Sequence, residues 1–206
     1  MVTAIVLCGG RARRFGADKL AARLPGGRTV LDATLAGVPA SWPVVCVGAE
    51  RPVQRAVRWV EEAEPFGGPL AGLAAGLAVV EDPVCVVLGG DMPYAGRALP
   101  VLVAPLSLVE DHPPVAGRAR PSLVERAQRV ETTPNSPNAA IAVTDRRQPL
   151  LAAYRTDALR RALPSEVSGA PMRRLWDALD LVEVTVDERA AYDIDTVGDL
   201  RAFPAD

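Results

Sequence analysis

Residues 3–20 read TAIVLCGGRARRFGADKL, and this stretch decides the fold. Thr3–Cys8 is an almost continuous apolar run, which is typical of a strand buried on both faces of a parallel sheet. Gly9 and Gly10 follow at once, and residues without a Cβ let a backbone approach a ligand closely. Four cationic side chains lie in the same loop: Arg11, Arg13, Arg14 and Lys19. Guanidinium and ammonium groups on a glycine-rich turn after a strand predict a polyanion site, with a solvated basic loop as the alternative.

The loop departs from two common phosphate-binding motifs. The pattern GxxxxGK[ST] is absent, because no Gly-Lys-Ser/Thr follows Gly9 or Gly10. The pattern GxGxxG fails as well, since Ala12 and Arg13 stand where glycine is needed. These departures argue against a P-loop ATPase and against a dinucleotide-dependent dehydrogenase.

Short apolar runs alternate with helical patterns in the first half of the chain. Two more buried strands are predicted at Trp42–Val47 and Pro83–Leu88. Helices are predicted between the strands, at Val30–Val38, Arg51–Val60 and Leu70–Val80. This order predicts an α/β fold: a single Rossmann-like domain over residues 1–206, with a mostly parallel sheet and helices on both faces. Ligands of such sheets bind beyond the carboxyl ends of the strands.

The second half is less regular. A stretch rich in Pro, Arg, Glu, Ser and Asn, Glu110–Asn138, is interpreted as an exposed insert with one possible short helix at Leu123–Val130. Further strands are predicted at Ala139–Val143, Pro149–Tyr154 and Leu181–Val186. Helices are predicted at Ala95–Leu106, Thr156–Leu163 and Met172–Leu179, and after Asp195-Thr196.

Composition excludes several classes of function. The net charge of −2 and the pI of about 5.6 give no sign of a nucleic-acid partner. No apolar run reaches the roughly 18 residues that span a bilayer, and the N-terminus does not resemble a signal peptide, so we expect a cytoplasmic protein without a membrane partner. Cys8, Cys46 and Cys85 each sit in an apolar run and are predicted to be buried core residues.

A resemblance now emerges from several motifs in order. The pattern GG-x-x-x-R-x-G-x-x-K over residues 9–19 resembles the signature of the molybdenum cofactor guanylyltransferase family, which belongs to the NTP transferases with a Rossmann-like sheet. Gly68-Pro69-Leu70-Ala71-Gly72 is similar to the family's GPLAG segment, which begins a helix beside the base. Gly90-Asp91-Met92-Pro93 resembles its magnesium site, Gln148-Pro149-Leu150 its QPL stretch, and Asp193-Ile194-Asp195-Thr196 its late return to the metal.

The resemblance implies transfer of GMP from GTP to the phosphate of molybdopterin, a phosphorylated pterin-type acceptor, with release of pyrophosphate and with Mg²⁺ as cofactor. Lys19, Arg14 and Asp91 would be catalytic, and Asp91 and Asp195 would bind Mg²⁺, whose preferred ligands are carboxylate, phosphate and water oxygens. A helix N-cap is the alternative role for Asp91 and for Asp195. Gln148 and Asp193 would lie on the acceptor side. The nucleotide would contact the following residues: Leu7, Cys8, Gly9, Gly10, Arg11, Lys19, Glu64, Gly68, Pro69, Leu70 and Asp91.

Some questions stay open at this point. Glu61, Glu62 and Glu64 compete for the acidic position that reads guanine in the family, and Glu64 is favoured. The family's polar residue after the second strand falls near Gly48, which has no side chain. Cytidylyl transfer to the same cofactor, guanylyl transfer to another acceptor such as phospholactate, and a non-catalytic nucleotide-binding partner in cofactor assembly remain as alternatives. A monomer or a weak oligomer would fit equally well.

Overall fold

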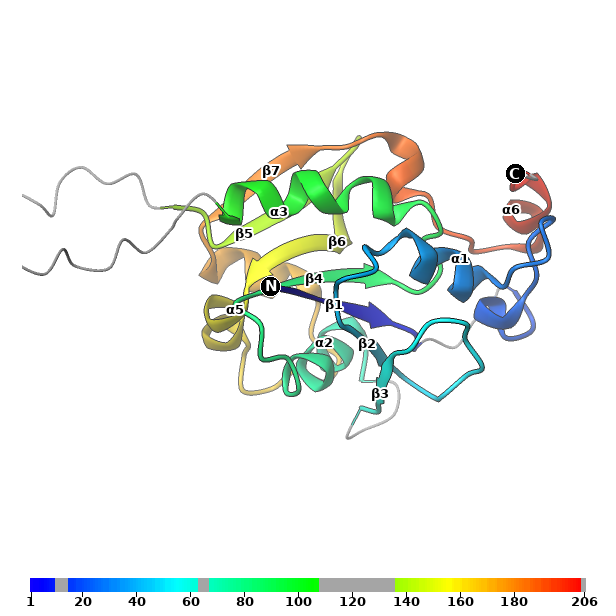
Figure 1. Ribbon diagram of the computed structural model, residues 1–206. Coiled ribbons are helices and arrows are strands. Elements are labelled where there is room, and N and C mark those ends of the chain that lie inside the picture. Colours follow the sequence, from blue (N-terminus) through cyan, green and yellow to red (C-terminus); the bar gives the residue numbers. More distant parts are fainter. Residues whose placement is uncertain (10–14, 63–66, 108–135, 205–206) are drawn as a thin grey trace, which may run out of the picture.

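The computed structural model describes residues 1–9, 15–62, 67–107 and 136–204. They form a seven-stranded sheet in the order β3-β2-β1-β4-β6-β5-β7 (Figure 1). Its strands are β1 (Val2–Leu7), β2 (Val44–Val47), β3 (Arg58–Val60), β4 (Val84–Gly89), β5 (Ala139–Val143), β6 (Arg147–Arg155) and β7 (Leu181–Thr185). β6 runs antiparallel to both of its neighbours, and every other pairing is parallel. The mostly parallel α/β sheet predicted from the sequence is confirmed.

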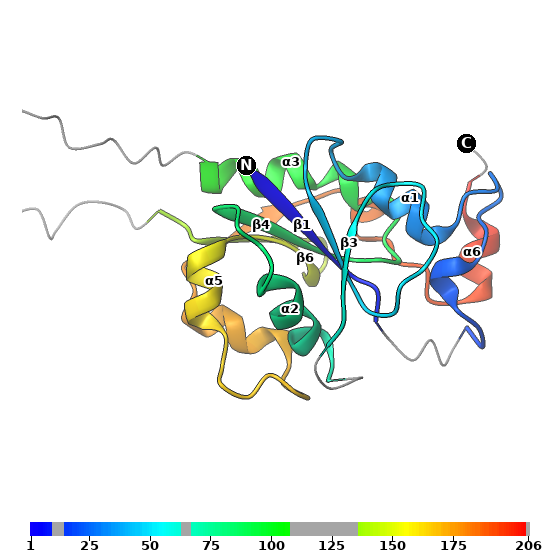
Figure 2. The ribbon, with the colours of Figure 1, turned by 60° about the horizontal axis from the view of Figure 1, so that its bottom comes forward.

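Helices cover both faces of the sheet, as predicted. Figures 1 and 2 show α1 (Val30–Gly37) and α3 (Leu99–Ser107) on one face, and α2 (Pro69–Leu77) and α5 (Thr156–Ala162) on the other. A last helix, α6 (Val197–Ala202), lies near the segment that follows β1. Four 3-10 turns complete the described elements: η1 (Lys19–Ala21), η2 (Ala95–Arg97), η4 (Met172–Ala178) and η5 (Glu188–Ala191). None of the described helices is long and apolar enough to cross a membrane.

Two apolar clusters fill the space between the sheet and its helices. Successive side chains of a strand point to opposite faces, so the central strand β1 contributes to both. Ala4 and Val6 pack with Leu31 of α1 and Leu99 of α3. Ile5 packs on the other face with the leucines of α2. β1 is buried on both sides, which explains its almost uninterrupted apolar sequence.

The loops that follow the parallel strands meet at one edge of the sheet. Just beyond β1, the Cys8 amide donates to the Val47 carbonyl at 2.8 Å, and the Gly90 amide donates to the Leu7 carbonyl at 2.9 Å. The Gly48 amide donates to the Val60 carbonyl at 2.9 Å. Because β6 is antiparallel, its first residues start at this same edge. The fold therefore brings the loops after β1, β2, β3 and β4 and the beginning of β6 together.

The predicted helix Arg51–Val60 is wrong. The segment has no helix and ends in the edge strand β3. Two contacts explain its extended course: the Gln54 amide donates to Asp32 Oδ1 of α1 at 2.8 Å, and the Arg55 guanidinium binds carbonyls at and beyond the C-terminal end of α1. These carbonyls belong to Leu35, Val38, Pro39, Ala40 and Trp42. Such tertiary bonds to main-chain groups left unpaired at a helix end are invisible to a periodicity argument.

Several other elements differ in bounds or type from those predicted from the sequence. The predicted helix Ala95–Leu106 is divided into the turn η2 and the helix α3, and Pro100, which has no amide hydrogen to donate, lies in the first turn of α3. The predicted helix Met172–Leu179 is a 3-10 segment, η4. β6 is longer at both ends than the predicted Pro149–Tyr154. Most of the predicted insert Glu110–Asn138, including its possible helix Leu123–Val130, lies outside the described residues.

Candidate active site

A cavity of about 500 Å³ opens where the loops after β1, β2 and β4 meet. Its walls include Cys8 and Gly9 after β1, Gly48 after β2 and Asp91 after β4. The opposite wall comes from the loop after β3 and from the first turn of α2. The cavity therefore lies beyond the carboxyl ends of the strands, where open α/β sheets bind their ligands.

Gly48 lets the loop after β2 lie directly against the loop after β1. Its φ is +129°, which L side chains rarely adopt, and an added Cβ would lie 3.2 Å from Cys8 C and from Gly9 N. A side chain at this position would push the two loops apart. The polar side chain that the family resemblance places near this position would therefore be strained in this chain.

Glu62 lines this cavity, and a main-chain amide holds its carboxylate in place. Its Oε2 accepts a hydrogen bond from the Gly67 amide at 3.0 Å. Its Oε1 would lie 3.3 Å from a Cβ built on Gly9 and 3.2 Å from one built on Gly72, so both glycines leave room for the carboxylate. Glu61 also lines the cavity, and Glu64, the residue favoured from the sequence, lies outside the described residues.

The first turn of α2 forms the wall beside Glu62. Gly68 precedes the helix with a φ of +90°, and Pro69 takes the first helical position, which suits a residue without an amide hydrogen. Gly68, Pro69 and Gly72 line the cavity. Leu70 instead points into the core, where it is completely buried. The Leu70 side chain is therefore out of reach of a nucleotide in the cavity, and only its main chain could make the predicted contact.

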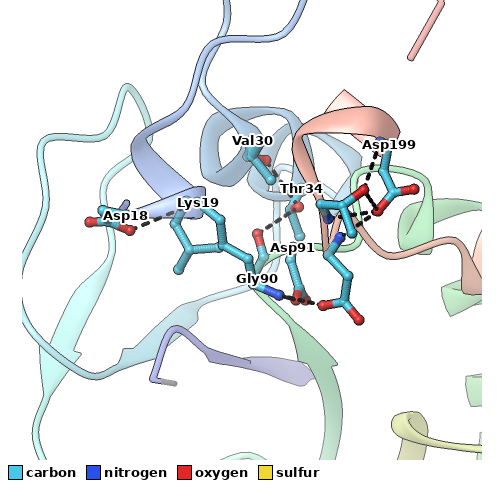
Figure 3. A network of polar contacts seen from close by, with 10 residues as sticks. Asp18, Lys19, Val30, Thr34, Gly90, Asp91 and Asp199 are labelled. Carbon is cyan, nitrogen blue, oxygen red and sulfur yellow. Dashed lines mark hydrogen bonds and ion pairs between the residues drawn. The ribbon is translucent and has the colours of Figure 1, made fainter. Parts of the chain in front are cut away.

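Lys19 lies between two carboxylates, Asp91 and Asp195, that are 104 positions apart in the sequence. Its Nζ contacts Asp91 Oδ2 and lies 2.9 Å from Asp195 Oδ1, and Figure 3 shows its side chain directed toward Asp91. The Asp195 segment is attached to the loop after β4 by a hydrogen bond of 3.0 Å from the Ile194 amide to the Asp91 carbonyl. Partial burial alone would lower the pKa of the Lys19 ammonium, but the Asp91 charge and the hydrogen bonds to both carboxylates raise it above its ordinary value. We call these three residues the Lys19 cluster.

The N-cap alternatives for the two aspartates are wrong. Thr196 caps α6 in a reciprocal capping box with Asp199, and Figure 3 shows Asp199 within this network. The Asp195 side chain is therefore directed to Lys19 instead. Asp91 lies in the turn before η2, whose N-cap is Tyr94.

Asp193 lies beside the Lys19 cluster. Burial, then the charges of Asp195 and Asp91, raise the pKa of its carboxyl above the ordinary value, and Lys19 offsets this only in part. Asp193 is thus close enough to sense both carboxylates. That it lies on the acceptor side stays a prediction.

Arg51 is a candidate that the sequence argument missed. It lines both the main cavity and a smaller pocket beside Lys19 and Asp91. Its Nε donates to Asp18 Oδ2 at 2.7 Å, and its Nη1 donates to the Ala49 carbonyl at 2.8 Å. Burial alone would raise the pKa of the Asp18 carboxyl, but the Arg51 guanidinium and main-chain hydrogen bonds outweigh burial and lower this pKa below its ordinary value. Arg51 was hidden because the sequence placed it in a helix.

The remaining predicted residues divide into two groups. Gln148 lies at the start of β6, where its Nε2 donates to Thr144 Oγ1 at 2.8 Å, and Leu150, two residues further along the strand, lines the cavity. That Gln148 lies on the side of the phosphorylated acceptor substrate stays a prediction. Gly10, Arg11 and Arg14 lie outside the described residues. Leu7, Cys8 and Gly9 line the cavity, and their contact with a nucleotide stays a prediction.

The donor set suits a metal ion that arrives with a phosphate ligand. Within residues 1–9, 15–62, 67–107 and 136–204, no group of three or more His, Cys, Asp or Glu side chains is arranged to bind a metal ion. Asp91 and Asp195 nevertheless share one cation, the Lys19 ammonium, so their oxygens already converge on a single point. Mg²⁺ needs only one or two protein carboxylates when phosphate and water supply its other ligands. The residues therefore fit a nucleotide-borne magnesium ion.

Known proteins resemble this chain in sequence and in structure. Residues 4–183 match the model of the MobA-like NTP transferase domain. A probable molybdenum cofactor guanylyltransferase of Chloroflexus aggregans is 34% identical over 116 residues, which are 54% of this chain and 56% of that protein, so the match spans only about half of each.

Solved structures share the fold at lower identity. The molybdopterin-guanine dinucleotide biosynthesis protein A of Archaeoglobus fulgidus superposes with a TM-score of 0.64 at 21% identity, covering 97% of this chain and 95% of that one. The 2-C-methyl-D-erythritol 4-phosphate cytidylyltransferase of Thermus thermophilus gives a TM-score of 0.62 at 20% identity, covering 97% and 96%. The structural likeness establishes the fold, and the domain match over residues 4–183 shows that this chain belongs to the MobA-like NTP transferase family.

Proposed function

We propose that this protein is a magnesium-dependent guanylyltransferase that moves GMP from GTP to the phosphate of molybdopterin and releases pyrophosphate. The observation that carries the proposal is a single cavity with Glu62 on one side and Asp91, a member of the Lys19 cluster, on the other. The Glu62 carboxylate can accept hydrogen bonds from a nucleotide base, and the charged groups of the Lys19 cluster can interact with a triphosphate and its metal ion. Family membership and the guanylyltransferase from Chloroflexus support the reaction type.

Glu62 favours guanine. Its Oε2 is engaged by the Gly67 amide, which leaves Oε1 to accept from a ligand. The Watson–Crick edge of guanine presents two neighbouring N–H donors, N1–H and the exocyclic amine, which suit a carboxylate. Cytosine presents only its N4 amine as a donor at that edge. A buried site that accepts hydrogen bonds discriminates against a base that lacks the donors, because the acceptor is then left unpaired.

The transfer needs no side-chain nucleophile. An oxygen of the acceptor phosphate forms a bond to the α-phosphorus of GTP, the bond from that phosphorus to the oxygen bridging to the β-phosphate breaks, and the electron pair leaves with pyrophosphate. The chain positions the two phosphates and stabilises negative charge. Lys19, with Arg14 as its predicted companion, neutralises the triphosphate and the departing pyrophosphate. Asp91 and Asp195 would bind Mg²⁺, which when present supplies further charge neutralisation at the phosphate oxygens.

The alternatives from the sequence differ in base, acceptor or catalysis. The cytidylyltransferase from Thermus shares the fold alone, so it adds no argument for CTP. A non-catalytic nucleotide-binding partner would have no need of an ammonium placed between two carboxylates beside the cavity. We therefore retain guanylyl transfer to molybdopterin, with phospholactate as the alternative acceptor for the test.

The test is product identification. The purified protein is incubated with Mg²⁺, one of GTP, CTP, ATP or UTP, and either molybdopterin or phospholactate, and the products are identified by mass spectrometry. The expected result is a guanylylated pterin and pyrophosphate with GTP alone. Formation of the cytidylyl product would correct the base, the phospholactate product would correct the acceptor, and no product with any pair would refute the proposed activity.

A further inference from the structure

Lys19 is the only lysine of the chain, although 23 residues are Lys or Arg. The other 22 basic residues are arginines, so the chain uses guanidinium groups wherever it needs a cation except here. The two groups differ in shape: guanidinium is planar and pairs side-on with one carboxylate, whereas ammonium is a compact point charge. A small metal ion bound between two carboxylates is likewise a compact point charge. The single lysine therefore stands at the position where its shape matters.

The ammonium occupies the space between the two expected metal ligands. Lys19 Nζ contacts Asp91 and lies 2.9 Å from Asp195 Oδ1, so the two carboxylate oxygens are held on either side of it. The Lys19 and Asp91 side chains are about one-fifth exposed, at 20% and 19%. Two carboxylates face one ammonium, so these three residues together leave one negative charge. That surplus suits an incoming divalent cation.

From this geometry we propose that Lys19 is an exchangeable counter-ion, which fills the metal position between Asp91 and Asp195 until a nucleotide-bound divalent cation replaces it. The inference rests on the proposed function and adds an order of binding to it. A free divalent cation would have to push the ammonium away from both of its partners and would give it no new one. A cation that arrives on a triphosphate brings phosphate oxygens for the displaced ammonium. The protein therefore discriminates against free metal and accepts the metal–nucleotide complex.

Hydrogen bonds of the neighbouring Asp18 hold the main chain at Lys19, so a rotation of the lysine side chain would suffice for the exchange. Asp18 uses Oδ1 to accept from the Leu20 amide at 3.2 Å, which caps η1, and Oδ2 to accept from Arg51 at 2.7 Å. Arg51 in turn donates to the Ala49 carbonyl after β2. The turn that carries Lys19 is thus attached to the neighbouring loop by charged hydrogen bonds, which are among the stronger ones in proteins. The long, flexible lysine side chain is the part that can move.

The sole lysine allows a direct spectroscopic test. Protein labelled with ¹⁵N at lysine Nζ gives one side-chain ammonium resonance, which is recorded with Mg²⁺ alone, with GTP alone and with both. We expect the resonance to stay in place with Mg²⁺ alone and to move when Mg²⁺ and GTP are present together. A shift already complete with millimolar Mg²⁺ alone, or an unchanged resonance after calorimetry shows that Mg·GTP has bound, would overturn the proposal.

Metal binding without nucleotide provides a second test that is independent of turnover. Free Mn²⁺ is counted by electron paramagnetic resonance in titrations of the wild type, of Lys19→Met and of the matched double variant Lys19→Met/Asp195→Asn. Removing the ammonium takes away a positive charge that repels a metal ion from the two carboxylates, so we expect Lys19→Met to bind Mn²⁺ about tenfold or more tightly than the wild type, and the double variant to lose this gain. Circular dichroism checks that each variant is folded. Equal Mn²⁺ affinity of a folded Lys19→Met and the wild type would overturn the proposal. Failure of Mg·GTP to bind the wild type would instead refute the proposed function, and the Mn²⁺ comparison would still decide the role of Lys19.

Discussion

Replacing Glu62 by Gln tests the assignment of the base at a single atom. The Gly67 amide donates to Glu62 Oε2 at 3.0 Å, and the amide oxygen of Gln can still accept this hydrogen bond, so the loop should keep its position. The amide nitrogen then takes the place of Oε1 and turns an acceptor into a donor. The Gln amide nitrogen and the N–H groups of guanine would then both be donors, so no hydrogen bond could form between them. Hydrogen bonds to a charged group contribute about 1.5–3 kcal/mol each, so losing one should lower kcat/KM for GTP by about 10- to 100-fold.

The assay compares GTP with ITP, which lacks the exocyclic amine of guanine. The wild type should prefer GTP, because the exocyclic amine gives Oε1, which can accept two hydrogen bonds, a second N–H donor, and Glu62→Gln should lose most of that preference. Glu61→Gln is the matched control, since Glu61 precedes Glu62 and lines the same cavity. Chemical denaturation shows whether either variant is less stable. Unchanged GTP kinetics in a folded Glu62→Gln, or an equal loss in Glu61→Gln, would refute the assignment of Glu62 to the base.

Three further changes probe the phosphate end and the packing. Lys19→Ala should lower kcat/KM for GTP by about tenfold or more without unfolding the protein, since one charge at the triphosphate is lost, and steady-state kinetics would show an unchanged value if Lys19 is outside the site. Asp91→Asn and Asp195→Asn should each raise the Mg²⁺ concentration needed for half-maximal rate, and the double variant should fall short of the product of the two effects; full additivity would assign them separate roles. Gly76→Ala should reduce the free energy of unfolding by about 1–3 kcal/mol, because the new Cβ would lie 2.6 Å from a side-chain methyl of β1. Gly26→Ala, with no atom within 4 Å of its Cβ, is the control for urea denaturation, and equal stability of the two variants would contradict the packing argument.

The sequence predicted those parts of the fold that depend on burial along the chain. β1 and β4 are buried on both faces, so their residues form uninterrupted apolar runs with clear limits. The glycine and aspartate residues just after them could then be placed at the carboxyl edge of the sheet from topology alone. Asp91 and Asp195 were expected to converge, and both contact Lys19.

The misses come from tertiary contacts. Arg51–Val60 has helix-like spacing, yet Arg55 binds carbonyls at the end of α1, and no local pattern reveals that contact. The same error hid Arg51. The position of Glu62 depends on the Gly67 amide and on the space beside Gly9 and Gly72, which only the folded loops define. Its assignment to the base is our proposal, and Glu64, which the sequence favoured, lies outside the described residues.

The link between Lys19 and Asp195 has a consequence for how the site is completed during synthesis. The two residues are 176 positions apart, so this contact is among the most non-local of the chain. Asp91 and the strands β1, β2, β3 and β4 belong to the first 91 residues, whereas Asp195 comes more than 100 residues later. During synthesis Asp91 is therefore available before Asp195, and a chain without the Asp195 segment has only one of the two carboxylates beside the lysine. The Lys19 cluster is complete only when the Ile194 amide binds the Asp91 carbonyl and brings the second carboxylate into place.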